Sequence, residues 1–378
     1  MIDKEKIKLC AKNIVNAINI QKKGENILVK GGTYSQDLLE EIARIYGYNK
    51  IKPTLFNTTI AQEGKKFRLK VVDQVREILY GCGLNEVITY SFISPETFDK
   101  IRIPEGHKLR NTVKIKDPLT RDHSLMRTSL ISSLLEVIKW NTNRQAGLVK
   151  VFEVGKIYLP YPDKPNSLPN EKLIIAGAIN KIGRGDVWEK SLPLDIFNVK
   201  GIIETVFQGL KVENWEVVPG NHPAFHPLRN GKIIMGGKEV GIFGEIHPEV
   251  INNYRIPEKV NLFEIDFENL LPNVPSDIKY CILPKYPLVQ RDLALIVKEE
   301  ILSADIIKTI KSIDEKLIKK VTLFDIFKGK QIGDGYKSLA YSMVFQAEDR
   351  TLTDQEVENI YKKIREQLIT KFSAKIRE

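Results

Sequence analysis

The stretch from Leu293 to Glu378 alternates strand and helix patterns in an order that decides one part of the fold. Runs rich in β-branched and aromatic residues indicate strands, and apolar residues three to four positions apart indicate helices. In chain order the runs are LALIV (293–297), ADIIKTIKSI (304–313), VTLFDIF (321–327), SLAYSMVF (338–345), DQEVENIYKKIREQL (354–368) and AKIRE (374–378). The order strand, helix, strand, strand, helix, strand predicts a ferredoxin-like βαββαβ domain.

Upstream of this stretch, helix and strand patterns mix without strict βαβ repetition. LMRTSLISSLLEVIKWNTN (125–143) predicts a helix. Strands are predicted for EVITYSFIS (86–94), VKVFEVGKIYL (149–159), LIIAGAIN (173–180), KIIMGG (232–237), VGIFGEI (240–246) and NLFEIDF (261–267). Short strands separated by turn residues favour an antiparallel sheet, so the fold class is α+β.

Three regions follow from these patterns. LPNVPSD (271–277) has the proline and polar content of a linker and opens the C-terminal domain, 271–378. The mixed sheet region is predicted to span 57–270. Residues 1–56 form a small helical region, with apolar stripes over 5–18 and 37–46 and a short strand between them.

Composition bounds the function. Lysine and arginine number 58 against 48 aspartate and glutamate residues, which gives a formal net charge of +10. Such a surface suits a polyanionic partner, although a lysine-rich solvated surface explains the charge equally well. The three cysteines, Cys10, Cys82 and Cys281, lie far apart in apolar contexts and predict reduced core thiols. No apolar run is long enough for a bilayer and the N-terminus is charged, so we expect a cytoplasmic protein with no membrane segment.

The chain resembles the beta subunit of bacterial-type phenylalanyl-tRNA synthetase in three sets of motifs. The first, DLLEEIARIYGYNKIKPTL (37–55), is similar to the end of that family's small helical domain. The second resembles the class II synthetase-like core: IKDPLTRDHSLMRTSLISSLLEVIKWNTNRQ (115–145), VFEVGKIY (151–158), HPLRNGKI (226–233) and GIFGEIHPEV (241–250). The third resembles the ferredoxin-fold anticodon-binding domain: KYPLVQRDLALIV (285–297), LFDIFKG (323–329) and KSLAYSMVFQAEDRTLTDQEV (337–357).

The resemblance implies a non-catalytic subunit. Such a chain pairs with a catalytic alpha subunit in a heterotetramer of two alpha and two beta chains, and it helps to bind tRNA-Phe while alpha uses ATP. A working class II synthetase carries an ATP-binding arginine two residues before the acid of the strand resembling VFEVGKIY. That acid is Glu153 here, and the position two before it is Val151. The next arginine after GIFGEIHPEV is Arg255. Without these cations the chain alone is expected to be inactive.

The resemblance also implies a magnesium site shared with the alpha subunit. The matching acids are Asp37, Glu40 and Glu41, on one face of a predicted helix, where their oxygens suit a hard cation. The family's fourth acid is replaced by Gly31. An N-terminal capping box formed by Asp37 and Glu40 explains the same acids without a metal.

RNA contact is expected in the C-terminal domain, where cations meet phosphates and aromatic rings stack on bases. The candidate residues are Lys285, Arg291, Lys328, Lys330, Lys337 and Arg350. The alternative is that Arg291–Asp292 and Asp349–Arg350 are local ion pairs, and that Thr353 and Glu356 cap a helix. In the core, Arg127 is interpreted as a buried interface arginine that is paired across the domain and is not reactive.

Other readings stay open. The family's editing module has no counterpart, so hydrolysis of mischarged tRNA is not expected. His222, His226 and His247 suggest a metal site only weakly, because prolines place them in turns. A stand-alone tRNA-binding or regulatory paralogue without a ligase partner is the main alternative. Residues 1–35 match the family poorly and resemble the start of some metal-dependent aminopeptidases, so an independent hydrolase is a further alternative.

Overall fold

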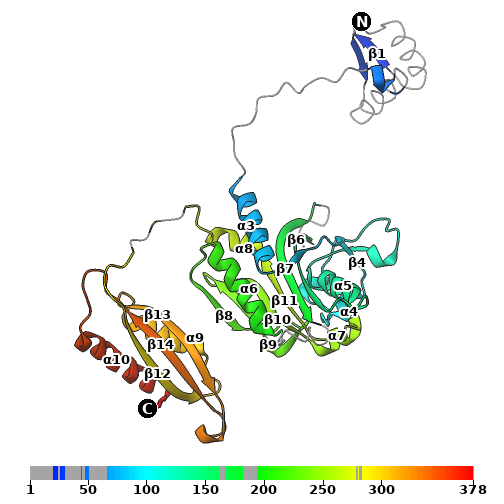
Figure 1. Cartoon of the computed structure of the whole chain (residues 1–378). Coiled ribbons are helices and arrows are strands. Elements are labelled where there is room, and N and C mark those ends of the chain that lie inside the picture. The colour runs from blue at the N-terminus through cyan, green and yellow to red at the C-terminus, as the bar shows by residue number, and fades with distance from the viewer. Residues whose placement is uncertain are drawn as a thin grey trace. The chain divides into compact units, whose positions relative to one another are not determined.

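The computed structural model describes residues 20–23, 26–29, 44, 47–50, 66–161, 167–181, 194–277, 280 and 283–377. The chain divides into two compact units, Met1–Gly64 and Lys65–Glu378 (Figure 1). In the first unit β1 (Ile20–Lys23) pairs antiparallel with β2 (Asn26–Val29), and the short helix η1 (Tyr48–Lys50) follows. Of the helices predicted over 5–18 and 37–46, only Arg44 is among the described residues, and it is helical.

Residues 85–266 contain a seven-stranded sheet. Its strand order is β3-β6-β7-β11-β10-β9-β8, and every neighbouring pair is antiparallel except β3 with β6. The strands are β3 (Asn85–Glu86), β6 (Leu148–Leu159), β7 (Asn170–Lys181), β8 (Trp215–Pro219), β9 (Phe225–Met235), β10 (Lys238–Ile246) and β11 (Val260–Asp266). The α+β class with a largely antiparallel sheet is therefore confirmed.

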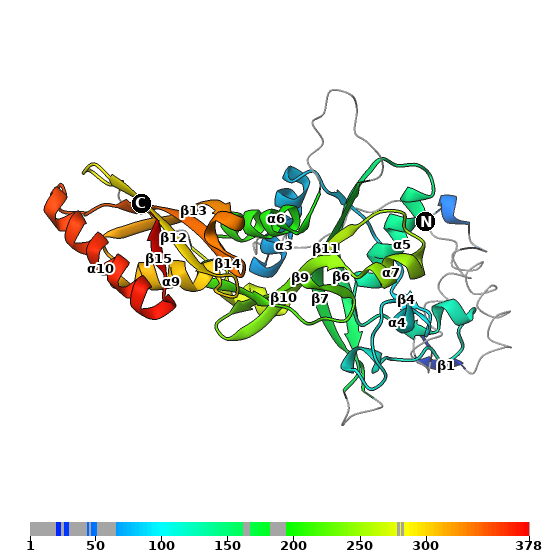
Figure 2. The same ribbon diagram turned by 90° about the horizontal axis from the view of Figure 1, so that it is seen from below.

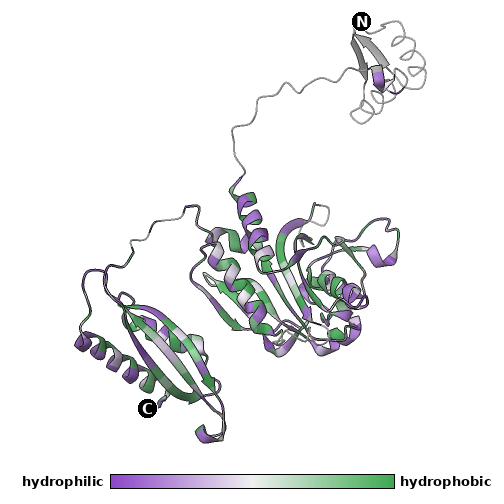
Figure 3. Ribbon diagram, in the orientation of Figure 1, coloured by the Kyte–Doolittle hydropathy of each residue, from purple (hydrophilic) through white to green (hydrophobic). Residues whose placement is uncertain are grey.

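Helices cover both faces of this sheet, as Figure 2 shows. One face packs against α3 (Phe67–Gly81), α6 (Ile196–Gly209) and α8 (Phe267–Leu270). The other packs against α4 (Thr97–Lys100), α5 (Ile131–Thr142) and α7 (Pro248–Tyr254). Successive side chains of a strand point to opposite faces. Ile174 and Ile175 of β7 accordingly belong to different buried clusters, and both are almost fully buried. Burial on both faces explains the unbroken apolar run of LIIAGAI (173–179), and the strands of this sheet show green and white in Figure 3.

The helix predicted over 125–143 begins later than its sequence pattern indicates. Leu125–Met126 forms β5 and pairs with β4 (Phe92–Ile93), and α5 starts only at Ile131. Backbone amides between β5 and α5 form tertiary hydrogen bonds instead of helical ones. The Arg127 amide donates to the Ser91 carbonyl, and the Leu130 amide donates to Glu264. Likewise, EVITYSFIS is not one strand. It contains the last residue of β3 and the two residues of β4, and residues 87–91 between them lie in no strand.

The C-terminal part has the predicted βαββαβ order. Its elements are β12 (Val289–Lys298), α9 (Ser303–Ile313), β13 (Ile318–Phe327), η5 (Lys330–Ile332), β14 (Tyr336–Phe345), α10 (Asp354–Phe372) and β15 (Lys375–Arg377). The sheet order is β13-β14-β12-β15, with all pairs antiparallel. Leu295, Tyr341 and Ile364 are fully buried in a cluster of their own, in which both helices pack on one face of the sheet. The η4 turn (Leu271–Asn273) precedes this region, and the boundaries predicted at 56/57 and 270/271 stay predictions.

Candidate functional site

A buried ion pair joins Arg127 to Glu153. Glu153 lies in β6, the strand in which a catalytic core would carry its nucleotide-binding arginine. Arg127 and Glu153 are each about 3% exposed, and Arg127 Nη2 lies 2.9 Å from Glu153 Oε1. Thr89 Oγ1 accepts from Arg127 Nη1 at 2.7 Å and donates to Glu153 Oε2 at 2.6 Å. A side chain at Gly155 would stand 2.6 Å from both charged groups, so this position needs glycine. The pairing predicted for Arg127 is therefore confirmed, and its partner is Glu153.

The position two residues before Glu153 is apolar and filled. Val151 is 5% exposed and belongs to the same buried cluster as Leu134 of α5. Arg255 is the left-handed residue that ends α7, and it is exposed. Neither position therefore places a guanidinium over the sheet. Arg127 is thus paired inside the core, and neither of these two positions offers an arginine to a nucleotide phosphate.

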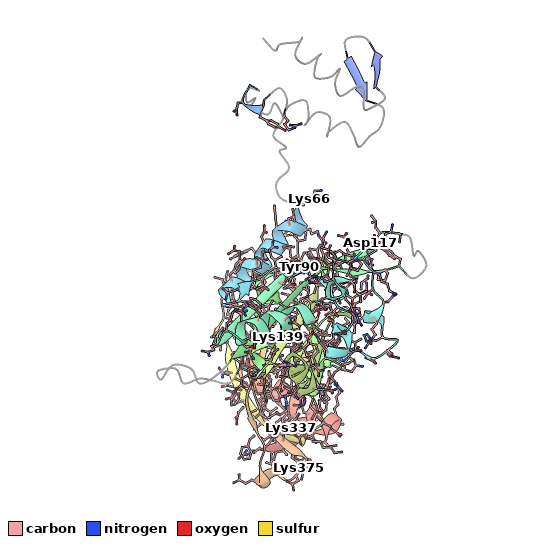
Figure 4. All side chains as sticks on the ribbon, turned by 90° about the vertical axis from the view of Figure 1, so that its right-hand side faces the viewer. Lys66, Tyr90, Asp117, Lys139, Lys337 and Lys375 are labelled. Carbon is pink, nitrogen blue, oxygen red and sulfur yellow. The ribbon has the colours of Figure 1, made fainter. Side chains whose placement is uncertain are left out.

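The segment that follows β3, the edge strand of the seven-stranded sheet, presents apolar side chains to solvent. Along the segment 87–93, Thr89 and Ser91 point inward to Glu153 and Tyr158, while Ile88 and Tyr90 point outward and are 94% and 75% exposed. Phe92 is exposed as well, and Tyr90 is labelled in Figure 4. Period-two alternation with the apolar residues on the solvent side is the reverse of what an edge strand of a monomer shows.

A neighbouring loop enlarges this apolar surface. The η3 turn (Arg121–His123) contacts β4, and the His123 ring lies 5.4 Å from the Tyr90 ring, centroid to centroid. Leu119, in the same loop, is completely exposed. We call Ile88, Tyr90, Phe92 and Leu119 the edge patch. The sequence did not reveal this patch, because its residues differ from core residues in their exposure and not in their type.

The cations predicted to contact RNA fall into two groups at opposite ends of the C-terminal sheet. Lys328 donates to Glu299, and the pKa of Lys337 is lowered by burial and by the neighbouring Lys328 ammonium. Lys330 lies in η5, and its side chain is outside what the structure describes. This group sits where β12 ends and β14 begins, because Lys337 pairs with Val297.

The other group lies near the N-terminus of α10, about 20 Å away along β12, since Arg291 precedes Val297 by six residues. Lys285 is exposed. Arg291 pairs with Asp354 at 3.4 Å, and not with Asp292 as the sequence suggested. Arg350 lies 3.1 Å from Asp349 and 2.8 Å from Glu356. The predicted cap is confirmed, since Thr353 and Glu356 form a reciprocal capping box on α10. The six cations therefore do not form a single patch.

This cap carries a pH-dependent prediction. Hydrogen bonds from the Thr353 amide, Arg350 and the Thr353 hydroxyl lower the pKa of Glu356 to about 2. The folded-state pKa lies below the unfolded value, so the contribution is complete above about pH 4.3 and is lost as the pH falls towards 2. Replacing Thr353 by alanine is expected to lower the free energy of unfolding by about 1 kcal/mol at neutral pH.

Glu356→Gln should flatten the loss of α10 helicity as the pH falls, measured by circular dichroism. An acid profile unchanged from that of the wild type would contradict the capping role of Glu356.

The sheet face opposite α9 and α10 carries an exposed aromatic ring beside a guanidinium. Phe327 pairs with Ser338 of β14, on the side away from the buried cluster, and is 37% exposed. The Arg377 guanidinium lies 6.0 Å from the centre of the Phe327 ring. A side chain at Gly329 would approach that ring to 2.8 Å, so this glycine keeps the ring's position open. Small residues, Ala294, Ala340 and Ser342, share this face through their register.

The histidines suggested as metal ligands have turn roles. His222, His226 and His247 each accept, through Nδ1, a backbone N–H two residues further on. His247 also starts α7, after β10 has ended at Ile246. In the described part of the chain, no cluster of three or more His, Cys, Asp or Glu side chains is arranged to hold a metal. Asp37, Glu40 and Glu41 lie outside the described residues, so the magnesium site stays a prediction.

No helix in the described ranges is long and apolar enough to cross a bilayer.

Two family models match the chain over most of its length. Residues 51–267 match the model of the phenylalanyl tRNA synthetase beta chain CLM domain. Residues 284–377 match that of the ferredoxin-fold anticodon binding domain.

Curated relatives agree with these matches. The phenylalanine–tRNA ligase beta subunit of Clostridium tetani is 42% identical over 344 residues, which cover 90% of this chain and 42% of the relative. That of Clostridium acetobutylicum is 38% identical over 349 residues, or 90% and 43% of the two chains. The chain thus spans about two fifths of the length of these relatives. Among solved structures, pyrrolysyl-tRNA synthetase from Desulfitobacterium hafniense has 16% identity and a TM-score of 0.43, and the match covers 54% of this chain and 68% of that one.

Proposed function

Because this chain belongs to the phenylalanyl-tRNA synthetase beta chain family, we propose that it is a non-catalytic part of a phenylalanine–tRNA ligase. In this proposal the alpha subunit uses ATP to charge tRNA-Phe in the cytoplasm, and the present chain supports that reaction as one of two beta chains beside two alpha chains. The observation that carries the proposal is the pairing of Arg127 with Glu153 beside a buried Val151. No editing step is assigned to these residues.

The edge patch supports binding of the alpha subunit. Its four side chains are large, apolar and exposed, and burying them against another chain would stabilise a complex. An exposed aromatic such as Tyr90 is the residue type that contributes most to protein interfaces. Asp37, Glu40 and Glu41 remain the proposed ligands for a magnesium ion shared with alpha.

The C-terminal sheet supports tRNA binding. Phe327 offers a ring face on which an unpaired base can stack, and Arg377 beside it can bind a phosphate. Lys285, Arg291, Lys328, Lys330, Lys337 and Arg350 are proposed to contact the RNA backbone around this face. Since Arg291, Lys328 and Arg350 already have carboxylate partners, each adds less than a free cation would.

The tRNA-binding proposal is tested by replacing the exposed ring. Phe327→Ala is expected to weaken binding of tRNA-Phe about tenfold, because one base loses its stacking partner. The matched control is Phe197→Ala, which removes an exposed ring from α6 and should leave the affinity unchanged. Fluorescence anisotropy with labelled tRNA-Phe measures both. Equal affinities of the wild type and Phe327→Ala would rule out stacking at this face.

A further inference from the structure

A cleft lies on the core sheet. The residues that line it belong neither to the buried Arg127–Glu153 pair nor to the edge patch. Its volume is about 690 Å³, within the range of small-molecule sites. Strands β6, β7 and β10 supply an apolar floor with Ile157, Ile174 and Ile242. The loops around His107 and His222 form one wall. The cleft lies on the sheet face that α5 and α7 share.

The wall of the cleft concentrates hydrogen-bond donors. His222 Nδ1 accepts from the Ala224 amide and His107 Nδ1 accepts from the Leu109 amide, both at 3.2 Å. In each neutral ring the proton therefore resides on Nε2, which is left to donate. Burial and the nearby His107, Lys108 and Lys232 lower the pKa of His222 to about 4, so this ring is neutral near pH 7.

Lys108 adds a charge to these donors. Lys232 is paired with Glu239 at 3.1 Å, and Lys172 with Asp266 at 2.8 Å. Lys108 is exposed and has no ion pair among the described residues. Two Nε2–H groups and one ammonium together suit a carboxylate or a phosphate.

The floor supplies one acceptor. Glu264 accepts from Ser129 Oγ at 2.8 Å and from the Leu130 amide at 2.9 Å, both through Oε2. The Ile131 amide also contributes a hydrogen bond to this carboxyl. An ionised carboxylate has about four lone-pair positions, so Glu264 can accept from one more donor. Burial raises the pKa of this carboxyl, and an amino group placed against it would offset the cost of its charge.

We propose that this cleft binds a small molecule that carries an amino group at one end and a carboxylate or phosphate at the other. Glu264 would accept from the amino group, while His107, His222 and Lys108 would donate to the anionic group. The apolar floor would contact the body of the ligand. A free amino acid would place an ammonium against Glu264, whereas an adenine nucleotide would place a neutral amine there, so the two are tested separately. The inference is independent of partner binding.

Nuclear magnetic resonance of the full chain, with labelled histidine, tests the proposal. The probes are L-phenylalanine and adenosine monophosphate. Each is compared with analogues that lack one group: phenethylamine and phenylpropionate for the first, inosine monophosphate and adenosine for the second. We expect saturable shifts of the His107 and His222 Nε2 signals and a higher pKa of His222 with one probe. Removing either group of that probe should weaken binding about tenfold, as expected for one charge-assisted hydrogen bond.

Variants separate the cleft from other histidines. Lys108→Ala changes an exposed side chain and should weaken binding about tenfold without affecting folding. His226→Ala, outside the cleft, should leave binding unchanged. The proposal is overturned if neither probe moves the two signals at roughly 10 mM. It is also overturned if the analogues bind as well as the probes, or if Lys108→Ala binds as the wild type does.

Discussion

Replacing Arg127 by methionine is expected to lower the free energy of unfolding of the core by about 3–5 kcal/mol, because the buried Glu153 carboxylate loses its partner. Thr89 alone cannot compensate, since it offers a single hydroxyl hydrogen. The core can be followed selectively. All three tryptophans, Trp140, Trp188 and Trp215, fall between residues 57 and 270, so tryptophan fluorescence during urea unfolding reports on this part of the chain.

Two comparisons test the physical reason. The double variant Arg127→Met, Glu153→Met should recover part of the loss, since no charge then remains buried. Lys156→Met breaks the half-exposed Lys156–Glu171 pair, whose Nζ–Oε2 distance is 2.6 Å, and should cost less than about 1 kcal/mol. If Arg127→Met also lowered the free energy of unfolding by less than about 1 kcal/mol, the Arg127–Glu153 network would not stabilise the core.

A second large effect is expected on association with the alpha subunit. Tyr90→Asp places a charge in the middle of the edge patch and should weaken binding at least about 30-fold, the size of a hot-spot loss. The side chain is 75% exposed in the free chain, so the unfolding free energy should change by no more than about 0.5 kcal/mol. Isothermal calorimetry with purified alpha subunit measures the affinity.

The matched control is Leu228→Asp, on β9. Leu228 is 88% exposed and lies outside the edge patch, so this variant should bind alpha as the wild type does. Equal weakening by both variants would point to a general effect of charge. Wild-type chain that binds tRNA-Phe and shows no affinity for alpha would instead favour the stand-alone paralogue.

The sequence predicted the order of elements well where the patterns were regular. The C-terminal βαββαβ order followed from clean runs of strand and helix residues. Helix α6 was missed, because Val199, Ile203 and Val206 are β-branched and have low helix propensity. Its capping box of Asp195 and Asn198 was the available signal.

The candidate surfaces were harder to predict. Alternation along β13 would place Phe327 inward, together with Val321 and Leu323. An irregularity between Leu323 and Asp325 shifts the register and turns Phe327 to the open face. The edge patch was hidden for a similar reason. Ile88 and Tyr90 look like core residues in the sequence, and only the inward bonds of Thr89 and Ser91 show that they point outward.

Pyrophosphate exchange tests the central claim most directly. The purified chain, given ATP, phenylalanine and magnesium, is expected to show no phenylalanine-dependent exchange of pyrophosphate into ATP, whereas the same chain mixed with alpha subunit should show it. Exchange by this chain alone would contradict the proposal that it is non-catalytic. Such exchange would require an adenylate-forming site in a core where Arg127 is paired with Glu153.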